Sequence, residues 1–159
     1  MRELLLLIDG SVNPQSKIGY GAYLALLEPE LSLDELKLQV KVRRFEQTSS
    51  TKLELQTLLW ALTDIKASAR KLVVYTDSQN IIGLAARRDQ LEKNNGHTNK
   101  KTRTNNYALY QEFFHLTDQL ECQFVKVRGH QQAKGKDKVD NLFTLVDRAA
   151  RKALRESLL

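Results

Sequence analysis

The stretch Leu4-Leu5-Leu6-Leu7-Ile8-Asp9-Gly10-Ser11 decides how the chain is organised. Its five consecutive apolar residues predict a strand that is covered on both faces of a sheet. The strand ends on a carboxylate, Asp9, which is costly beside a core unless a positive charge lies next to it. Asp9-Gly10 is also typical of a turn that closes a strand.

A second strand repeats this pattern. Residues 72–76 are largely apolar and are followed by Asp77 and Ser78. If the two strands lie side by side, their acids meet at one end of the sheet. The recurrence therefore favours a shared role for Asp9 and Asp77 over two unrelated turns.

Length and composition limit the class of protein. The 159 residues predict one domain, residues 1–159, with a sizeable core. The chain has 25 Lys and Arg residues and 19 Asp and Glu residues. The resulting net charge of +6 favours a polyanionic partner, and nucleic acid is the first candidate. The single cysteine, Cys122, excludes an internal disulfide and fits a reducing cytoplasm. The N-terminal apolar run is too short for a signal peptide or a membrane helix, so we expect a cytoplasmic protein that does not bind membranes.

The order of the expected elements indicates a mixed α/β sheet with helices on its faces. After the first strand, we expect strands over residues 18–27 and 36–45. The second of these is expected because apolar residues alternate with polar ones, at Leu36, Leu38, Val40 and Val42. Short connections favour an antiparallel meander with the first strand innermost. A helix is expected to begin within residues 48–51 and to run to about residue 69. Further helices are expected at residues 79–87, 106–119 and 140–155, and further strands at residues 71–76 and 122–127.

Carboxylates recur where these elements converge. The candidates are Asp9, Glu54, Asp77 and one or more of Asp137, Asp140 and Asp147. An acid cluster in a net-positive chain is explained if cations fill it, and oxygen-only ligands select Mg²⁺ or Mn²⁺. Two such ions about 3.5–4 Å apart stabilise both oxygens of a phosphodiester displacement, which indicates a metal-dependent nuclease. Two of the acids have structural alternatives, because Thr51-Lys52-Leu53-Glu54 fits a capping box and Asp140 is typical of an N-cap.

Five motifs resemble, in order, those of type 1 ribonuclease H, and they cover nearly the whole chain. They are Ile8-Asp9-Gly10-Ser11, Thr51-Lys52-Leu53-Glu54-Leu55, Thr76-Asp77-Ser78-Gln79, Val127-Arg128-Gly129-His130 and Val146-Asp147-Arg148-Ala149-Ala150. The resemblance implies a ribonuclease H-like fold, with a mixed five-stranded sheet of three antiparallel and then two parallel strands, flanked by helices. It also implies a metal-dependent endoribonuclease that hydrolyses the RNA strand of RNA–DNA hybrids by a two-metal-ion mechanism.

The resemblance also implies residue roles. Two Mg²⁺ ions, or Mn²⁺ ions, would be bound by Asp9, Glu54, Asp77 and Asp147. Asp140 is the alternative to Asp147 as the fourth ligand. The loop residue His130 would help the product leave or would shuttle a proton. Substrate contacts would fall on Gly10, Ser11, Asn13, Ser49, Ser50, Thr51, Gln79, Lys100, Lys101 and Arg103. The last three lie in the basic stretch 87–103, where bacterial members carry a protruding handle, although a basic stretch is also typical of a solvated loop. This stretch has no tryptophan, and Ser50 and Thr51 replace an asparagine pair found in many members.

Two other functions stay open. One is another nuclease of the same fold, either an exonuclease or a resolvase-like enzyme. The exonucleases place a second acid two residues after the first, where this chain has Ser11. The other is a hybrid-binding module without catalysis, against which the presence of all four acids argues. We expect a monomer whose partner is an RNA–DNA hybrid.

Overall fold

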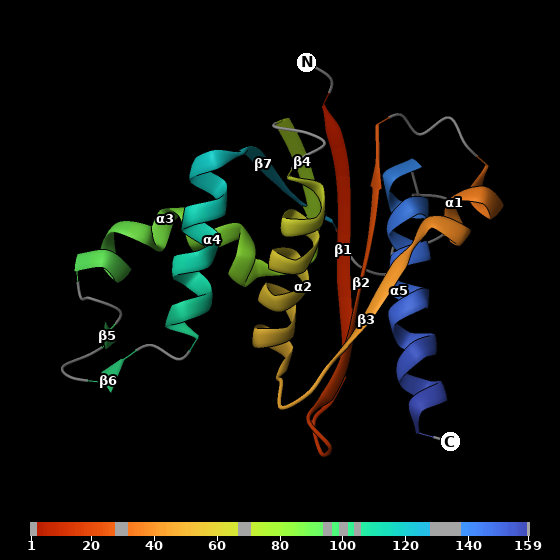
Figure 1. Ribbon diagram of the computed structural model, residues 1–159, viewed down its shortest axis with the longest axis horizontal. Coiled ribbons are helices and arrows are strands. Elements are labelled where there is room, and N and C mark those ends of the chain that lie inside the picture. Colours follow the sequence, from red (N-terminus) through yellow and green to blue (C-terminus); the bar gives the residue numbers. More distant parts are fainter. Residues whose placement is uncertain are drawn as a thin grey trace.

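A mixed five-stranded sheet forms the centre of the computed structural model, which describes residues 3–27, 32–66, 71–93, 97–98, 102–103, 106–127 and 138–158 (Figure 1). Its strands, in the order in which they lie, are β3 (Lys41–Phe45), β2 (Ile18–Leu26), β1 (Leu4–Asn13), β4 (Lys71–Thr76) and β7 (Glu121–Lys126). The pairings β3–β2 and β2–β1 are antiparallel, whereas β1–β4 and β4–β7 are parallel. The expected sheet, with the first strand innermost, is confirmed.

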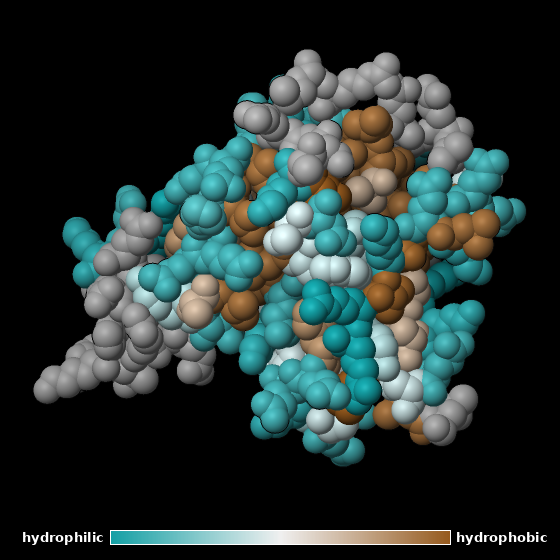
Figure 2. All heavy atoms as spheres, in the orientation of Figure 1, coloured by the Kyte–Doolittle hydropathy of each residue, from teal (hydrophilic) through white to brown (hydrophobic). Residues whose placement is uncertain are grey.

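Helices cover both faces of this sheet. On one face lie α2 (Ser50–Ile65), α3 (Gln79–Lys93) and α4 (Tyr107–Gln119), and on the other lie α1 (Leu33–Gln39) and α5 (Lys138–Ser157). Two short strands, β5 (His97–Thr98) and β6 (Thr102–Arg103), form a separate ribbon that the sequence does not predict. The face of the molecule seen in Figure 2 is largely hydrophilic, with patches of hydrophobic residues near its middle. Within the described ranges, no helix is both long enough and apolar enough to cross a bilayer.

The alternation of side chains along β1 decides which way its acid points. Leu6 and Ile8 belong to the core under α2, whereas Leu7 belongs to the core under α5. Asp9 continues the face of Leu7, because side chains alternate along a strand. The strand extends to Asn13, so Asp9 lies within it, and the expectation that the strand ends on this acid is wrong.

The parallel register places the two strand acids at the same level. Leu7 lies opposite Tyr75 in the β1–β4 pair. Asp9 and Asp77 each come two residues further along, where β4 has ended and β1 continues. The sheet geometry therefore brings these carboxylates to one edge.

The expected strand over residues 36–45 is wrong in its first half. Residues 33–39 form α1, and only residues 41–45 form β3. The Ser32 hydroxyl caps α1 by accepting a hydrogen bond from the backbone N–H of Glu35 at 3.2 Å. Leu36 is buried under α5, whereas Leu38 is 88% exposed, so the alternation of these leucines does not mark one apolar strand face. Ser32 and Glu35 have the spacing of a capping box, which is the sequence signal that identifies this helix.

Three glycines let α2 lie unusually close to the β1–β2 hairpin. A Cβ atom added to Gly10 or to Gly19 would lie 2.8 Å from the Leu53 side chain, and one added to Gly21 would overlap Thr57. We call Gly10, Gly19 and Gly21 the glycine seat. Because α2 rests on this seat, its first turn reaches the level of Asp9 and carries Glu54 with it.

Candidate active site

Four carboxylates come from four different elements of the fold. Asp9 is partly buried within β1, and Asp77 follows the last residue of β4. Glu54 lies near the start of α2, and Asp147 lies in the middle of α5 with 24% of its side chain exposed. Sheet register, the glycine seat and the packing of α5 each position one or more of these acids.

The environment of Asp9 shows that three of the acids are close together. Burial, the negative charge of Asp77 and a side-chain hydrogen bond with Asp147 raise the pKa of Asp9 to about 8, and the backbone N–H of Gly10 opposes this shift only in part. A carboxyl group with this pKa is mostly protonated at neutral pH and can donate its proton to Asp147. Without a cation, the cluster therefore reduces its own charge by holding a proton.

Glu54 faces this cluster instead of the end of its own helix. Burial and the charge of Asp77 raise the pKa of Glu54, whereas a hydrogen bond from the Ser78 hydroxyl opposes the rise. That bond is 2.6 Å long, from Ser78 Oγ to Glu54 Oε2. The N-cap of α2 is Ser49, whose hydroxyl accepts from the backbone N–H of Lys52 at 3.3 Å. The capping-box interpretation of Glu54 is therefore wrong.

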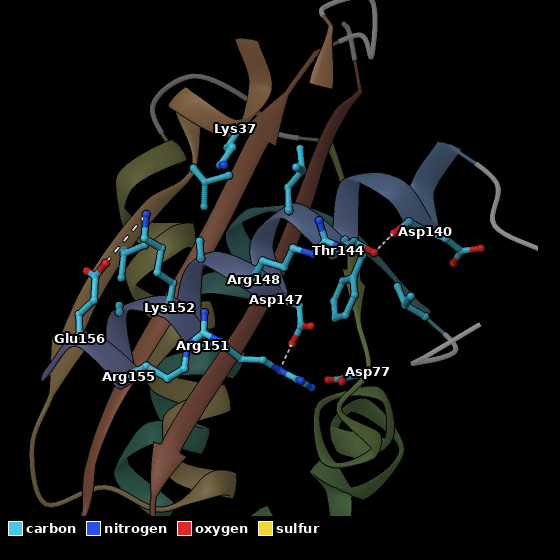
Figure 3. A pocket seen from close by; sticks show the side chains of 17 residues that line it. Lys37, Asp77, Asp140, Thr144, Asp147, Arg148, Arg151, Lys152, Arg155 and Glu156 are labelled. Atoms are coloured by element: carbon cyan, nitrogen blue, oxygen red, sulfur yellow. Dashed lines mark hydrogen bonds and ion pairs between the residues drawn. The ribbon is translucent and has the colours of Figure 1, made fainter. Parts of the chain in front are cut away.

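Asp147 has a cationic partner on the next turn of α5. Arg151 Nε donates to Asp147 Oδ1 at 3.0 Å, and Figure 3 shows Asp77 close to this pair. Asp77, Asp140 and Asp147 all line one groove of about 840 Å³ beside α5.

Asp140 occupies a different position from the one expected. The helix begins at Lys138, so Asp140 lies inside the first turn and does not occupy the N-cap position. Its carbonyl oxygen accepts a hydrogen bond from the Thr144 hydroxyl at 2.9 Å. Its negative charge near the positive end of the helix dipole is favourable in this position, without a metal.

The donor set of the cluster fits a hard divalent cation. All four candidate ligands are carboxylates, and oxygen ligands are those that Mg²⁺ and Mn²⁺ prefer. Across the described ranges, no three metal-ligating side chains converge tightly enough to enclose an ion. Glu54 is bound to Ser78 and Asp147 to Arg151, so two of the four carboxylates are held by neighbouring side chains.

Several of the expected substrate-contacting residues border the acid cluster. Gly10 and Ser11 follow Asp9 in β1, and Ser50 and Thr51 are exposed in the first turn of α2. The backbone N–H of Thr48 donates to the carbonyl of Lys17 at 2.9 Å, so the β1–β2 turn lies beside the start of α2.

Three other expected contact residues have structural roles. Asn13 Oδ1 shapes the β1–β2 turn by accepting from the backbone N–H of Gln15 at 2.9 Å. Ser49 serves as the N-cap of α2. Gln79 Oε1 accepts from Lys126 Nζ at 2.8 Å, at the same end of the sheet as Asp77. These side chains would have to exchange partners to contact a ligand.

The basic stretch 87–103 is only partly described. Lys100 and Lys101, like His130, lie outside the described residues, and Arg103 lies in β6. Arg87 donates to the side chain and carbonyl of Asn80, both at 2.7 Å, so it braces its own helix α3. Arg88 connects α3 to α4 through an ion pair with Asp118 at 2.6 Å. At least these two arginines therefore contribute to the fold.

Sequence reasoning missed three residues that hold the candidate site residues in place: Ser78, Lys126 and Arg151. Two of them have a sequence signal that could have found them. Ser78 directly follows the strand acid Asp77, and Arg151 lies four residues after Asp147, where helical side chains meet. Lys126 contacts Gln79 only through the pairing of β7 with β4, and we see no local pattern that predicts it.

Comparison with known proteins agrees with this arrangement. The chain is 26% identical over 145 residues to proteins named ribonuclease H from two strains of Clostridium botulinum, an alignment that covers 89% of this chain and 93% of each relative. A family model described as RNase H matches residues 1–154. That match includes all of the candidate acids, and the chain therefore belongs to the RNase H family.

Proposed function

We propose that this protein is a Mg²⁺-dependent endoribonuclease that hydrolyses the RNA strand of RNA–DNA hybrids. The observation that carries the proposal is the gathering of Asp9, Glu54, Asp77 and Asp147 from four elements, in a chain of net charge +6. Carboxylates that only stabilised a fold would be expected to pair with the surplus cations, whereas the charge of Asp77 helps to raise the pKa values of both Asp9 and Glu54. Membership of the RNase H family supports the choice of substrate.

In this proposal the four carboxylates hold two Mg²⁺ ions. Bound Mg²⁺ would stabilise charge on the attacking and leaving oxygens of the phosphodiester displacement. Asp9 would release the proton it holds in the free protein, because a cation favours the ionised form of a neighbouring carboxyl. The Ser78 hydroxyl orients Glu54, and the Arg151 guanidinium orients Asp147. These two carboxylates therefore each have a hydrogen-bond partner before the ions would bind.

We propose Asp147 as the fourth ligand in preference to Asp140. The side chain of Asp147 hydrogen-bonds to that of Asp9, which connects it directly to the other acids. Asp140 is explained by its place in the first turn of α5.

The remaining proposed roles concern the substrate. His130 would assist product departure or proton transfer, and Lys100, Lys101 and Arg103 would contact phosphates. Ser49 would grip a phosphate of the DNA strand, and Gly10 and Ser11 would also contact the substrate. Asn13, Ser50, Thr51 and Gln79 would read the minor groove of the hybrid. There the 2′-hydroxyls lie on one strand only, and these groups let a protein distinguish RNA from DNA.

The test is cleavage of end-labelled duplexes in Mg²⁺. We expect cutting of an RNA–DNA hybrid on its RNA strand, none of double-stranded DNA, and loss of cutting when the RNA strand carries 2′-O-methyl groups. The matched controls are Asp77→Asn, which should be inactive, and Asp89→Asn, an exposed acid of α3 that should cut normally. Equal cutting of double-stranded DNA would favour a resolvase-like enzyme, and tight hybrid binding with no cutting would favour a silent binding module.

A further inference from the structure

One face of α5 carries four cations in a row. Arg148, Arg151, Lys152 and Arg155 are all exposed. Arg148 lies three and four residues before the neighbours Arg151 and Lys152, and Arg155 lies three and four residues after Lys152 and Arg151. Residues at these spacings lie on the same side of a helix. We call these four residues the basic face of α5. The opposite side of the helix is buried against the sheet through Leu142, Val146 and Ala150, so packing does not require the basic face.

The charges of the basic face are only partly neutralised. Within the described part of the chain, neither Arg148 nor Arg155 has a carboxylate within 4.0 Å. Lys152 lies 3.9 Å from Glu156, and both side chains are more than half exposed, so this pair contributes little. Arg151 is the exception, because its ion pair with Asp147 belongs to the acid cluster.

The basic face borders the groove that contains two of the candidate metal ligands. Asp77 and Asp147 line this groove together with all four cations, and Lys37 of α1 lines it as well. Val42 of β3 and small residues of α5, such as Ala149 and Ala153, also line it. Figure 3 shows Arg151 paired with Asp147, and Lys152 and Arg155 further along α5 from Asp77 and Asp147. The groove therefore joins the acid cluster to a surface rich in positive charge.

We propose that the basic face of α5, with Lys37, binds the phosphate backbone of the nucleic-acid strand that passes the acid cluster. The inference rests on the proposed function and extends it to a second contact surface, separate from the stretch 87–103. Successive turns of α5 repeat about every 5.4 Å along the axis, so the cations form a row suited to a row of phosphates. A separate acidic protein would also match the charge, but the groove leads directly to Asp77 and Asp147, which favours the substrate strand.

The test uses two triple variants with the same change of net charge. Arg148→Gln/Lys152→Gln/Arg155→Gln removes the basic face and leaves the Arg151–Asp147 pair in place. Lys66→Gln/Lys71→Gln/Lys93→Gln removes three exposed lysines, from the C-cap of α2, from β4 and from α3, none of which lines the groove. Hybrid binding is measured as a function of salt, with a short hybrid that covers only the acid cluster and with a longer one. Equal urea midpoints for the two triples and the parent chain confirm that all are folded.

We expect the basic-face variant to bind the long hybrid at least tenfold more weakly than the control triple. Three lost phosphate contacts should reduce the slope of log K against log salt by about 2.7, since each contact contributes about 0.9. The short hybrid should show a much smaller loss.

Equal affinity and equal salt slope for the two triples would overturn the inference, and an acidic protein partner would then be the better explanation of the basic face. The parent chain separates this failure from that of the proposed function. If the parent cuts hybrids but the basic-face variant binds them like the control, only this inference fails. If the parent cuts no hybrid while the basic-face variant still loses affinity, the proposed catalysis fails and the binding surface is supported.

Discussion

Replacing Asp9 with Asn should stabilise the protein without metal and remove most of its stability change between pH 5 and 8. Asp9 has a pKa of about 8 in the folded chain and 3.8 as its ordinary value. The folded state therefore holds a proton that the unfolded state has released. This contribution is fully present below the unfolded pKa, decreases as pH rises, and is lost above the folded pKa.

The magnitude follows from the width of this window. One pKa unit corresponds to about 1.36 kcal/mol, so the three units from pH 5 to 8 set a ceiling of about 4 kcal/mol on the loss of unfolding free energy. Asp9 is not fully buried, and solvent screens its neighbours, so we expect a loss of about 2 kcal/mol in the parent chain. Asn cannot ionise, and the variant should lose little over the same range.

The assay is urea unfolding at pH 5, 6, 7 and 8 in a chelator, repeated with Mg²⁺. Mg²⁺ at about a hundred times its Kd should stabilise the parent by about 2.7 kcal/mol, whereas Asp9→Asn should gain much less. Asp89→Asn, an exposed acid of α3, is the matched control and should follow the parent. The reasoning is refuted if the stability of the parent is flat or rises from pH 5 to 8 in the chelator, or if Asp9→Asn is the less stable protein at pH 8.

Three further predictions concern the acids and the seat of α2. Asp147→Asn should reduce Mg²⁺-dependent turnover at least about tenfold, or about 1.4 kcal/mol in the barrier. Asp140→Asn should keep activity and lose at most about 1 kcal/mol of stability, because it removes a charge that favours the positive end of the helix dipole. Single-turnover rates with melting curves check both, and the reverse pattern would transfer the fourth ligand to Asp140. Gly21→Ala should lose about 1–3 kcal/mol in urea unfolding because its Cβ overlaps Thr57. Gly83→Ala on α3 should gain about 0.5–1 kcal/mol, because its Cβ would make only an ordinary contact with Arg87 Nε at 3.8 Å. Equal effects of the two substitutions would contradict the close seating of α2. Ser78→Ala should raise the pKa of Glu54, because it removes a hydrogen bond that lowers this pKa, and the acid limb of the pH profile of cleavage should move to higher pH. The substitution should also destabilise α3 by about 1 kcal/mol, because Ser78 Oγ accepts a hydrogen bond from the Ile81 N–H at 3.2 Å. An unchanged pH profile would exclude an orienting role for Ser78.

Much of the sheet was predictable because its signals are local. The apolar runs before Asp9 and Asp77 mark buried strands, and short connections indicate the antiparallel half. The helix over 33–39 was obscured by the alternation of Leu36, Leu38 and Val40, although Ser32 and Glu35 carry its capping signal. Alternation alone cannot distinguish a short amphipathic helix from a strand when one of the leucines is left in solvent, as Leu38 is.

The candidate site was predictable to the level of residue type and motif, but its contacts were not. Motif order identifies Asp9, Glu54, Asp77 and Asp147, yet the choice between Glu54 as cap or as site residue depended on whether Ser49 or Thr51 begins the helix. A shift of two residues decides this, and helix starts are poorly fixed by sequence. The pairing of Gln79 with Lys126 depends on β4 lying beside β7, which no single segment encodes.

The parallel pairing of β1 with β4 has a consequence for the order in which the acids can assemble during folding. The β1–β2 hairpin closes over a few residues, and α2 can settle on its glycines soon afterwards, which brings Asp9 and Glu54 near each other early. Asp77 joins them only after residues 4–7 pair with residues 72–75, and Asp147 only after α5 docks on the opposite face. Every earlier intermediate holds an incomplete set of carboxylates. A growing chain would therefore complete the proposed cation-binding set only after β4 has paired with β1 and α5 has docked. Under the proposed function, a partly folded chain should have neither strong metal affinity nor the ability to cut nucleic acid.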